Sequence, residues 1–178
     1  IPDYSNLEDA LKRALDFWSQ QQSTKAKTFF KQALDVIHKS TITCLRISDF
    51  NTSGLVGSRE EYNSPWCNLT KSSGASDKSG SHGGSFGIGK FAPYACSSLR
   101  TVFYSTSDKD GLCASQGVSR LTSFKSKKNE ITQGTGFYGN DKNSPMYKQF
   151  SLDPAYSRSA ENSGTDIFIA AFNGDKGW

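Results

Sequence analysis

A glycine-rich stretch that ends in a lysine is the part of this sequence best suited to chemistry. Residues 83–95 read GGSFGIGKFAPYA, and from Gly84 they match the G-x-x-x-x-G-K portion of a phosphate-binding P-loop. A P-loop follows a buried apolar strand and continues with a Ser or Thr that binds magnesium. Here the polar residues 72–83 come before the motif, and Phe91 follows Lys90. Both departures argue against a P-loop and favour another kind of nucleotide site.

The backbone of this stretch is suited to binding an anion. Its glycines permit conformations that other residues avoid, and they stand just before a predicted helix over 88–99: Gly84, Gly87 and Gly89. Free N–H groups at the start of a helix attract negative charge. The hydroxyl of Ser85 could add a further donor. We therefore expect residues 84–89 to approach phosphate groups.

The side chains of the same stretch are less decisive than its backbone. Lys90 could place a positive charge on a phosphate, or it could be an ordinary surface lysine. Phe86 and Ile88 are expected to anchor the loop by packing and not to be the principal ligand contacts. The prediction for this segment therefore depends mainly on its glycines.

A carboxylate at the end of a short predicted strand is the second candidate for ligand binding. Residues 41–50, TITCLRISDF, alternate Leu45 and Ile47 with polar residues, which indicates a strand with one wet face. Asp49 closes this strand, and Gly54 lies in the turn that follows. A carboxylate here can accept a hydrogen bond from the exocyclic amine of adenine, whereas the alternative interpretation is an acid that caps a turn.

Three motifs occur in the order found in one ATPase superfamily. GGSFGIGKFAPYACSSLRTVFYST, residues 83–106, resembles the G-x-x-G-x-G lid motif of the GHKL superfamily, which includes gyrase, the ninety-kilodalton heat-shock chaperone, histidine kinases and MutL. LRISDFNTSGL, residues 45–55, resembles its strand, Asp and glycine turn, and SGTDIFIAAF, residues 163–172, its late Gly-Thr strand. The resemblance spans residues 41–172, and the chaperone and the microrchidia (MORC-type) ATPases look most similar.

The resemblance implies a single ATP-binding domain over residues 1–178 with a Bergerat, or histidine-kinase-like, fold. This fold is α+β: a two-layer sandwich of a mixed, mostly antiparallel sheet with helices on one face. Residues 55–83 would form an ATP lid between the first two motifs. ATP with Mg2+ would be the cofactor, and an ATP-dependent homodimer the assembly.

The resemblance also assigns roles to individual residues. Asp49 would bind the adenine amine, Gly54 would let the backbone approach the base, and Leu55 would form part of the pocket wall. Thr165 resembles the threonine near the phosphate end, although an ordinary strand threonine is an equal alternative. The turn D-F-N-T-S-G is one residue longer than the D-x-G-x-G of the superfamily and lacks its middle glycine.

The residues that hydrolyse ATP in this superfamily are not found in the sequence. They form an E-x-x-x-N pattern on a helix before the Asp strand, and in residues 1–48 neither Glu8 nor Asp35 is followed by Asn four positions later. We expect that helix, with its general base and magnesium ligand, to lie before Ile1. The chain would then be a fragment of a longer ATPase, and it carries no predicted catalytic residue.

The remaining sequence predicts the elements that would support such a site. Residues 6–18 and 24–39 each place apolar side chains on one helical stripe, and Ser23 or Thr24 could cap the second helix. Short β-rich runs predict strands over 100–107, 112–124 and 165–172. Helices and strands in this order indicate an α+β domain and not strict βαβ alternation.

Composition narrows the setting and leaves three classes of function. No apolar run is long enough to span a membrane, and the four cysteines lack C-x-x-C spacing, which argues against a structural zinc site. A reducing cytoplasm is the expected compartment. An ATP-binding domain of a GHKL ATPase is the leading interpretation, and a non-hydrolysing nucleotide sensor or dimerisation module is the alternative. A nucleic-acid-binding module is the third, because the net charge is +4 and Lys125, Lys127 and Lys128 cluster at a predicted hairpin tip.

Overall fold

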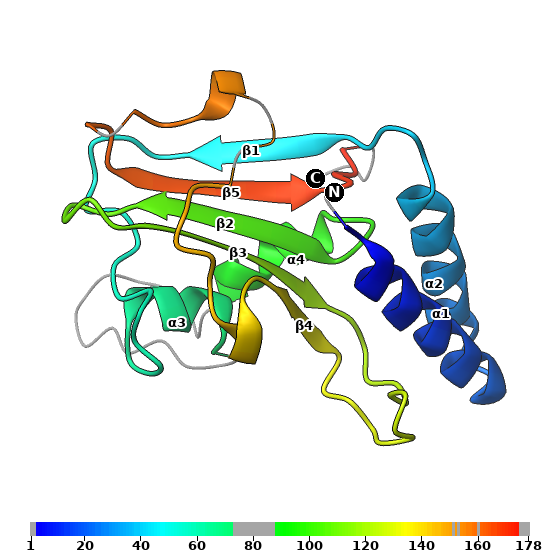
Figure 1. Ribbon diagram of the computed structural model, residues 1–178. Helices are drawn as coiled ribbons and strands as arrows, with labels where there is room; N and C mark the ends of the chain where they lie inside the picture. The colour runs from blue at the N-terminus through cyan, green and yellow to red at the C-terminus, as the bar shows by residue number, and fades with distance from the viewer. Residues whose placement is uncertain (1–2, 73–87, 151, 153, 160, 175–178) are drawn as a thin grey trace.

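The protein is α+β, with four helices and an open five-stranded antiparallel sheet in the part of the chain that is described (Figure 1). The computed structural model describes residues 3–72, 88–150, 152, 154–159 and 161–174. The helices are α1 (Ser5–Gln20), α2 (Thr24–Ile37), α3 (Pro65–Thr70) and α4 (Ala92–Ala95). The strands are β1 (Cys44–Ser48), β2 (Thr101–Ser107), β3 (Cys113–Arg120), β4 (Thr135–Tyr138) and β5 (Gly164–Ala170).

The sheet has the order β1-β5-β2-β3-β4, so the last strand lies between β1 and β2. All pairings recorded among the described strands are antiparallel, which corrects the expectation of a mixed sheet. The tight turn at Asp108–Gly111 joins β2 to β3, and β5 runs antiparallel to both of its neighbours. As a result, the end of β1 meets the beginning of β5.

Helices α1 and α2 form a hairpin at one end of the sheet (Figure 1). The apolar stripes predicted from the sequence become one buried cluster that includes Leu11, Phe30 and Ile37. This cluster packs against Leu99, just before β2, and Ala171, just after β5. This arrangement corrects the prediction that all of the helices lie on one face of the sheet. No helix within the described residues is long and apolar enough to cross a membrane.

The two faces of the sheet carry separate apolar clusters. On one face, a group that we call the Trp66 cluster joins strand residues to α3 and α4: Trp66, Cys67, Tyr94, Val102, Tyr104, Ala114 and Val118. The alternate strand residues Phe103 and Phe168 pack with Phe150 on the other face. This alternation follows from the two-residue period of a strand. Because both faces are covered, all residues of β2 are buried.

Helix α3 lies inside the long polar stretch that was interpreted as a lid. Pro65 occupies the first turn, and the hydroxyl of Ser64 accepts a hydrogen bond from the Cys67 N–H at 3.1 Å, which caps the helix. Trp66 is completely buried in the cluster described above. Residues 65–70 are thus part of the packed layer, and residues 73–83 lie outside the described residues.

The helix predicted over 88–99 is shorter than expected. A 3-10 turn over Ile88–Phe91 leads into α4, which ends at Ala95. The hydroxyl of Ser97 donates to the Ala170 carbonyl at 2.6 Å and accepts from the N–H groups of Leu99 and Thr101. These bonds turn the chain into β2 and end the helical run.

Candidate functional site

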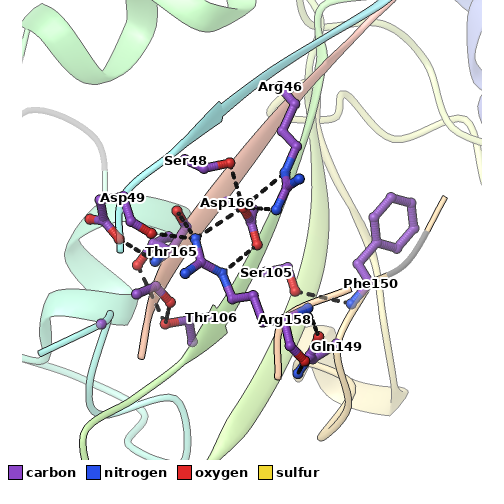
Figure 2. Close-up of polar contacts among 12 residues, drawn as sticks. Arg46, Ser48, Asp49, Ser105, Thr106, Gln149, Phe150, Arg158, Thr165 and Asp166 are labelled. Atoms are coloured by element: carbon purple, nitrogen blue, oxygen red, sulfur yellow. Dashed lines mark hydrogen bonds and ion pairs between the residues drawn. The ribbon is translucent and has the colours of Figure 1, made fainter. Parts of the chain in front are cut away.

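The predicted adenine-binding residue and the predicted Gly-Thr pair meet at one corner of the sheet (Figure 2). Asp49 follows β1, and its N–H donates to the Thr165 carbonyl at 3.0 Å. In return, the Thr165 N–H donates to Oδ1 of Asp49, although the two residues are 116 positions apart. The antiparallel register that places Ser48 opposite Asp166 produces this contact.

The two carboxylate oxygens of Asp49 have different surroundings. Oδ1 also accepts a hydrogen bond from the Thr52 hydroxyl at 3.2 Å. No described residue donates to Oδ2, and the side chain is exposed. One oxygen is therefore held by the protein, and the other is able to accept a hydrogen bond from a ligand amine.

The turn after Asp49 is fixed against the end of β2. The Leu55 N–H donates to the Thr106 hydroxyl at 2.8 Å, and this hydroxyl donates to the Gly164 carbonyl at 3.1 Å. Gly54 has φ +62°, and a Cβ there would lie 2.6 Å from the Ser107 carbonyl oxygen. The backbone angle and the close approach of the Ser107 carbonyl therefore require glycine at position 54. This requirement does not depend on whether a ligand lies nearby. No local sequence pattern predicted the role of Thr106.

Gly164 is confined in the same way. Its φ is +149°, and a Cβ would lie 2.4 Å from the Asp49 carbonyl oxygen and 2.6 Å from Asp49 Oδ1. We expect Gly164→Ala to lower the free energy of unfolding by about 1–3 kcal/mol, because both the backbone angle and the space disfavour a side chain. Urea unfolding measures the loss. In the control, Gly136→Ala in β4, the added Cβ meets no atom of the described residues within 4 Å. Equal losses in the two variants would contradict this explanation.

Much of the predicted phosphate-binding segment lies outside the described residues. These are Gly84, Ser85, Phe86 and Gly87, together with the side chain of Ile88. Gly89 is the first glycine of the motif among the described residues, and a Cβ there would meet no described atom within 4 Å. Packing therefore does not explain a glycine at position 89, and its role in binding phosphate stays a prediction.

Lys90 is attached to the protein and is not a freely extended surface lysine. Its Nζ donates to the Asn68 carbonyl of α3 at 3.1 Å. Partial burial, and then the nearby charge of Arg120, hold the pKa of Lys90 below its usual value. The Arg120 guanidinium lies 5.1 Å from the centre of the Phe91 ring. Two cations thus lie beside the end of the glycine motif, and a contact between Lys90 and phosphate remains a prediction.

Residues from all three motifs pack on the same face of the sheet. Leu55 from the first motif, Phe91 from the second and Ile167 from the third are packed against the Trp66 cluster. Thr165 is on this face as well, since it alternates with Asp166 along β5. Neither Asp49 nor Thr165 lines the main cavities found among the described residues. One of these cavities borders residues 56–60, directly after Leu55, and the others lie between α1 and the sheet and along its margins. The candidate site is therefore the place where the three motifs meet on this face of the sheet. The described residues form one side of it.

A buried ion-pair cluster lies behind Asp49, on the other face of the sheet (Figure 2). The Asp166 side chain, 4% exposed, accepts hydrogen bonds from Arg158 at 2.7 Å, from Arg46 at 2.8 Å and from Ser48 at 2.6 Å. Burial acts to raise the pKa of Asp166, but these hydrogen bonds outweigh it and hold the pKa below 3.8. Sequence reasoning missed this cluster, because no local pattern links β1, β5 and the loop that holds Arg158.

The hydrogen-bonded Asp166 carboxylate predicts how the free energy of unfolding depends on pH. Because the pKa of Asp166 is lower in the folded state, its stabilising effect is complete above the unfolded value of 3.8 and is lost as the pH falls below that value. We expect Asp166→Asn to be less stable than the wild type at neutral pH, and the difference to shrink between about pH 4 and 2. Chemical denaturation across this range measures it. A difference that stays constant down to about pH 2 would contradict the assignment.

No protein-family model, curated protein or solved structure matches this chain. The case for a function therefore rests on the residues themselves. Of the predicted site, the structure brings Asp49, Gly54, Leu55 and Thr165 together, while the start of the glycine motif lies outside the described residues. Among the described residues, no group of three or more His, Cys, Asp or Glu side chains is arranged to hold a metal ion.

Proposed function

We propose that this chain is an adenine-nucleotide-binding domain of the GHKL type, with a Bergerat fold. The observation that carries the proposal is the convergence of the three motifs: Leu55, Phe91 and Ile167 pack against one cluster, and Asp49 is bonded to Thr165 beside them. The α+β architecture, with α3 and α4 on the face of the sheet that carries the site, supports the proposal.

The adenine end of the ligand would be recognised by Asp49. Thr165 and Thr52 occupy Oδ1, so the carboxylate is fixed before a ligand arrives. Oδ2 would accept a hydrogen bond from the 6-amino group of adenine, whereas guanine presents a carbonyl oxygen at that position. Two acceptors facing each other repel, which supports a preference for adenine over guanine.

The phosphate end would lie against the glycine motif. Backbone N–H groups of residues 84–89 would face the phosphates, and the positive charges of Lys90 and Arg120 lie beside the described end of this segment. The residues of this chain would bind the nucleotide. Hydrolysis would need a general base and a magnesium ligand in addition. In a longer protein, ATP binding would drive closure of the lid and dimerisation.

Thermal unfolding with added nucleotides tests the proposal. A ligand that binds only the folded state stabilises it by mass action, by about 2.7 kcal/mol at a hundred times its Kd. We expect ATP and ADP to raise the unfolding temperature of the chain, and GTP to raise it much less. An equal response to GTP, or no response to any of the three, would contradict the proposal.

The basic residues that raised the nucleic-acid alternative lie at a hairpin tip, as predicted. Lys125 pairs with Ile131 across the hairpin, and Lys127 Nζ lies 3.5 Å from the carboxylate of Asp9. One of the three positive charges therefore has an acidic neighbour. Binding to nucleic acid that weakens steeply with salt and ignores ATP would favour this alternative.

A further inference from the structure

Arg158 connects the loop before β5 to the corner of the sheet that holds Asp49. Its Nη2 donates to the main-chain carbonyls of Asp49 and Thr165, the latter at 3.0 Å. Its Nε and Nη2 also form two hydrogen bonds with the Asp166 carboxylate, at 2.7 and 3.0 Å. One guanidinium thus joins the end of β1 to the beginning of β5 (Figure 2).

Arg158 is itself firmly held. The Gln149 side chain accepts from the Arg158 N–H at 3.0 Å and donates to the Arg158 carbonyl at 3.1 Å. Phe150, the next residue, donates its N–H to the Ser105 hydroxyl and stacks on Phe103. The Arg158 side chain is 2% exposed, and its guanidinium lies 4.5 Å from the centre of the Phe50 ring. The loop and the sheet therefore fix the guanidinium before any ligand binds.

The position of Arg158 bears directly on the Asp49 carboxylate. Asp49 is the first residue after β1, and its carbonyl and N–H are bonded to Arg158 and Thr165 respectively. A Cβ added at Gly164 would lie 2.6 Å from both Arg158 Nη1 and Asp49 Oδ1, so the guanidinium lies directly behind the Gly-Thr pair. Without Arg158, the Asp49 carbonyl would lose its donor at the strand end, where the next turn begins.

We infer that Arg158 is a positioning residue for nucleotide binding: from the opposite face of the sheet, it fixes the backbone of Asp49 so that Oδ2 points toward the adenine amine. This inference rests on the proposed function. Arg158 would touch no part of the ligand. It acts through the main chain of Asp49 and Thr165, and its ion pair with Asp166 holds the guanidinium in place.

The variant Arg158→Lys tests the inference. Lysine keeps the positive charge near Asp166, but its single nitrogen cannot serve the carboxylate and both carbonyls with the planar geometry of arginine. We expect ADP binding, measured by calorimetry, to weaken about tenfold, with a smaller loss for GDP. We expect no further loss when Arg158→Lys is added to Asp49→Asn, because the positioned group is already gone.

Controls separate positioning from general destabilisation. Leu11→Ala disrupts the fully buried α1–α2 cluster, far from the site, and should lower the unfolding temperature while ADP affinity stays within about twofold. Gln149→Ala keeps the guanidinium and removes the two bonds that hold the Arg158 backbone. It should weaken ADP binding less than Arg158→Lys, and it serves as the test if the latter fails to fold.

The possible outcomes are distinct. If the wild type binds ADP through Asp49 but both Arg158→Lys and Gln149→Ala keep its affinity within about twofold, the positioning role is overturned and the proposed function stands. Additive losses in the double variant with Asp49→Asn would also overturn it. If the wild type binds no ADP, the proposed function and this inference fail together.

Discussion

Replacing Asp49 with Asn is expected to weaken ADP binding about 10- to 100-fold and to remove the preference for adenine over guanine. A hydrogen bond to a charged group contributes about 1.5–3 kcal/mol, which corresponds to this range. The orientation of the new amide also matters. Thr165 N–H and Thr52 hydroxyl both need an acceptor at the Oδ1 position, so the amide oxygen is expected there. The amide NH2 would then face the ligand.

An NH2 group in the place of Oδ2 replaces a hydrogen-bond acceptor with a donor. Two donors then face each other when adenine is bound, whereas the new NH2 group can donate to the carbonyl oxygen of guanine. Calorimetric titration of wild type and Asp49→Asn with ADP and GDP measures the change. Asp110→Asn, which makes the same substitution at an exposed position in the β2–β3 turn, is the control and should leave both affinities unchanged. Parallel losses of ADP and GDP affinity in Asp49→Asn would contradict the assigned role.

Removing the Trp66 side chain is expected to cause the largest loss of stability, about 3–5 kcal/mol. Trp66 is completely buried and links α3 to Tyr94 and to strand residues such as Val102. Its deletion leaves a cavity that the short helix cannot fill without moving. Because Leu55 packs against the same cluster, weaker nucleotide binding should accompany the loss.

Urea unfolding of Trp66→Ala measures this effect. Tyr62→Ala, four residues earlier, removes an aromatic side chain that is 77% exposed and should change stability by less than about 0.5 kcal/mol. A loss below about 1 kcal/mol in Trp66→Ala would show that α3 is not part of the core.

The regular elements were predictable where a local pattern was strong. The amphipathic stripes of α1 and α2 and the β-rich runs of β2 and β5 are complete within each segment. Helix α3 was missed, because a six-residue helix in a run rich in Gly, Ser and Asn shows no period. Its remaining signals were the Ser64-Pro65 start and the tryptophan that follows.

The site was predictable only in part, for a similar reason. Asp49 and Thr165 could be paired because each belongs to a recognisable motif, and their order along the chain matches one superfamily. Arg158 could not be found in this way. It lies in an irregular loop and reaches a carbonyl 109 residues away, a contact set by the position of β5 between β1 and β2. Contacts of this kind depend on the tertiary fold, so no local or periodic sequence pattern predicts them.

We propose that Asp49 holds one end of an adenine nucleotide and that the glycine motif holds the other end of the same molecule. Amide chemical shifts of the isotope-labelled chain, recorded during titration with ADP, report on both ends at once. We expect the amides of Leu55, Thr165 and Lys90 to shift together with a single Kd, and the amide of Asn129 at the hairpin tip to stay unchanged. Shifts at Thr165 and Lys90 that follow different Kd values, or shifts confined to the hairpin tip, would contradict it.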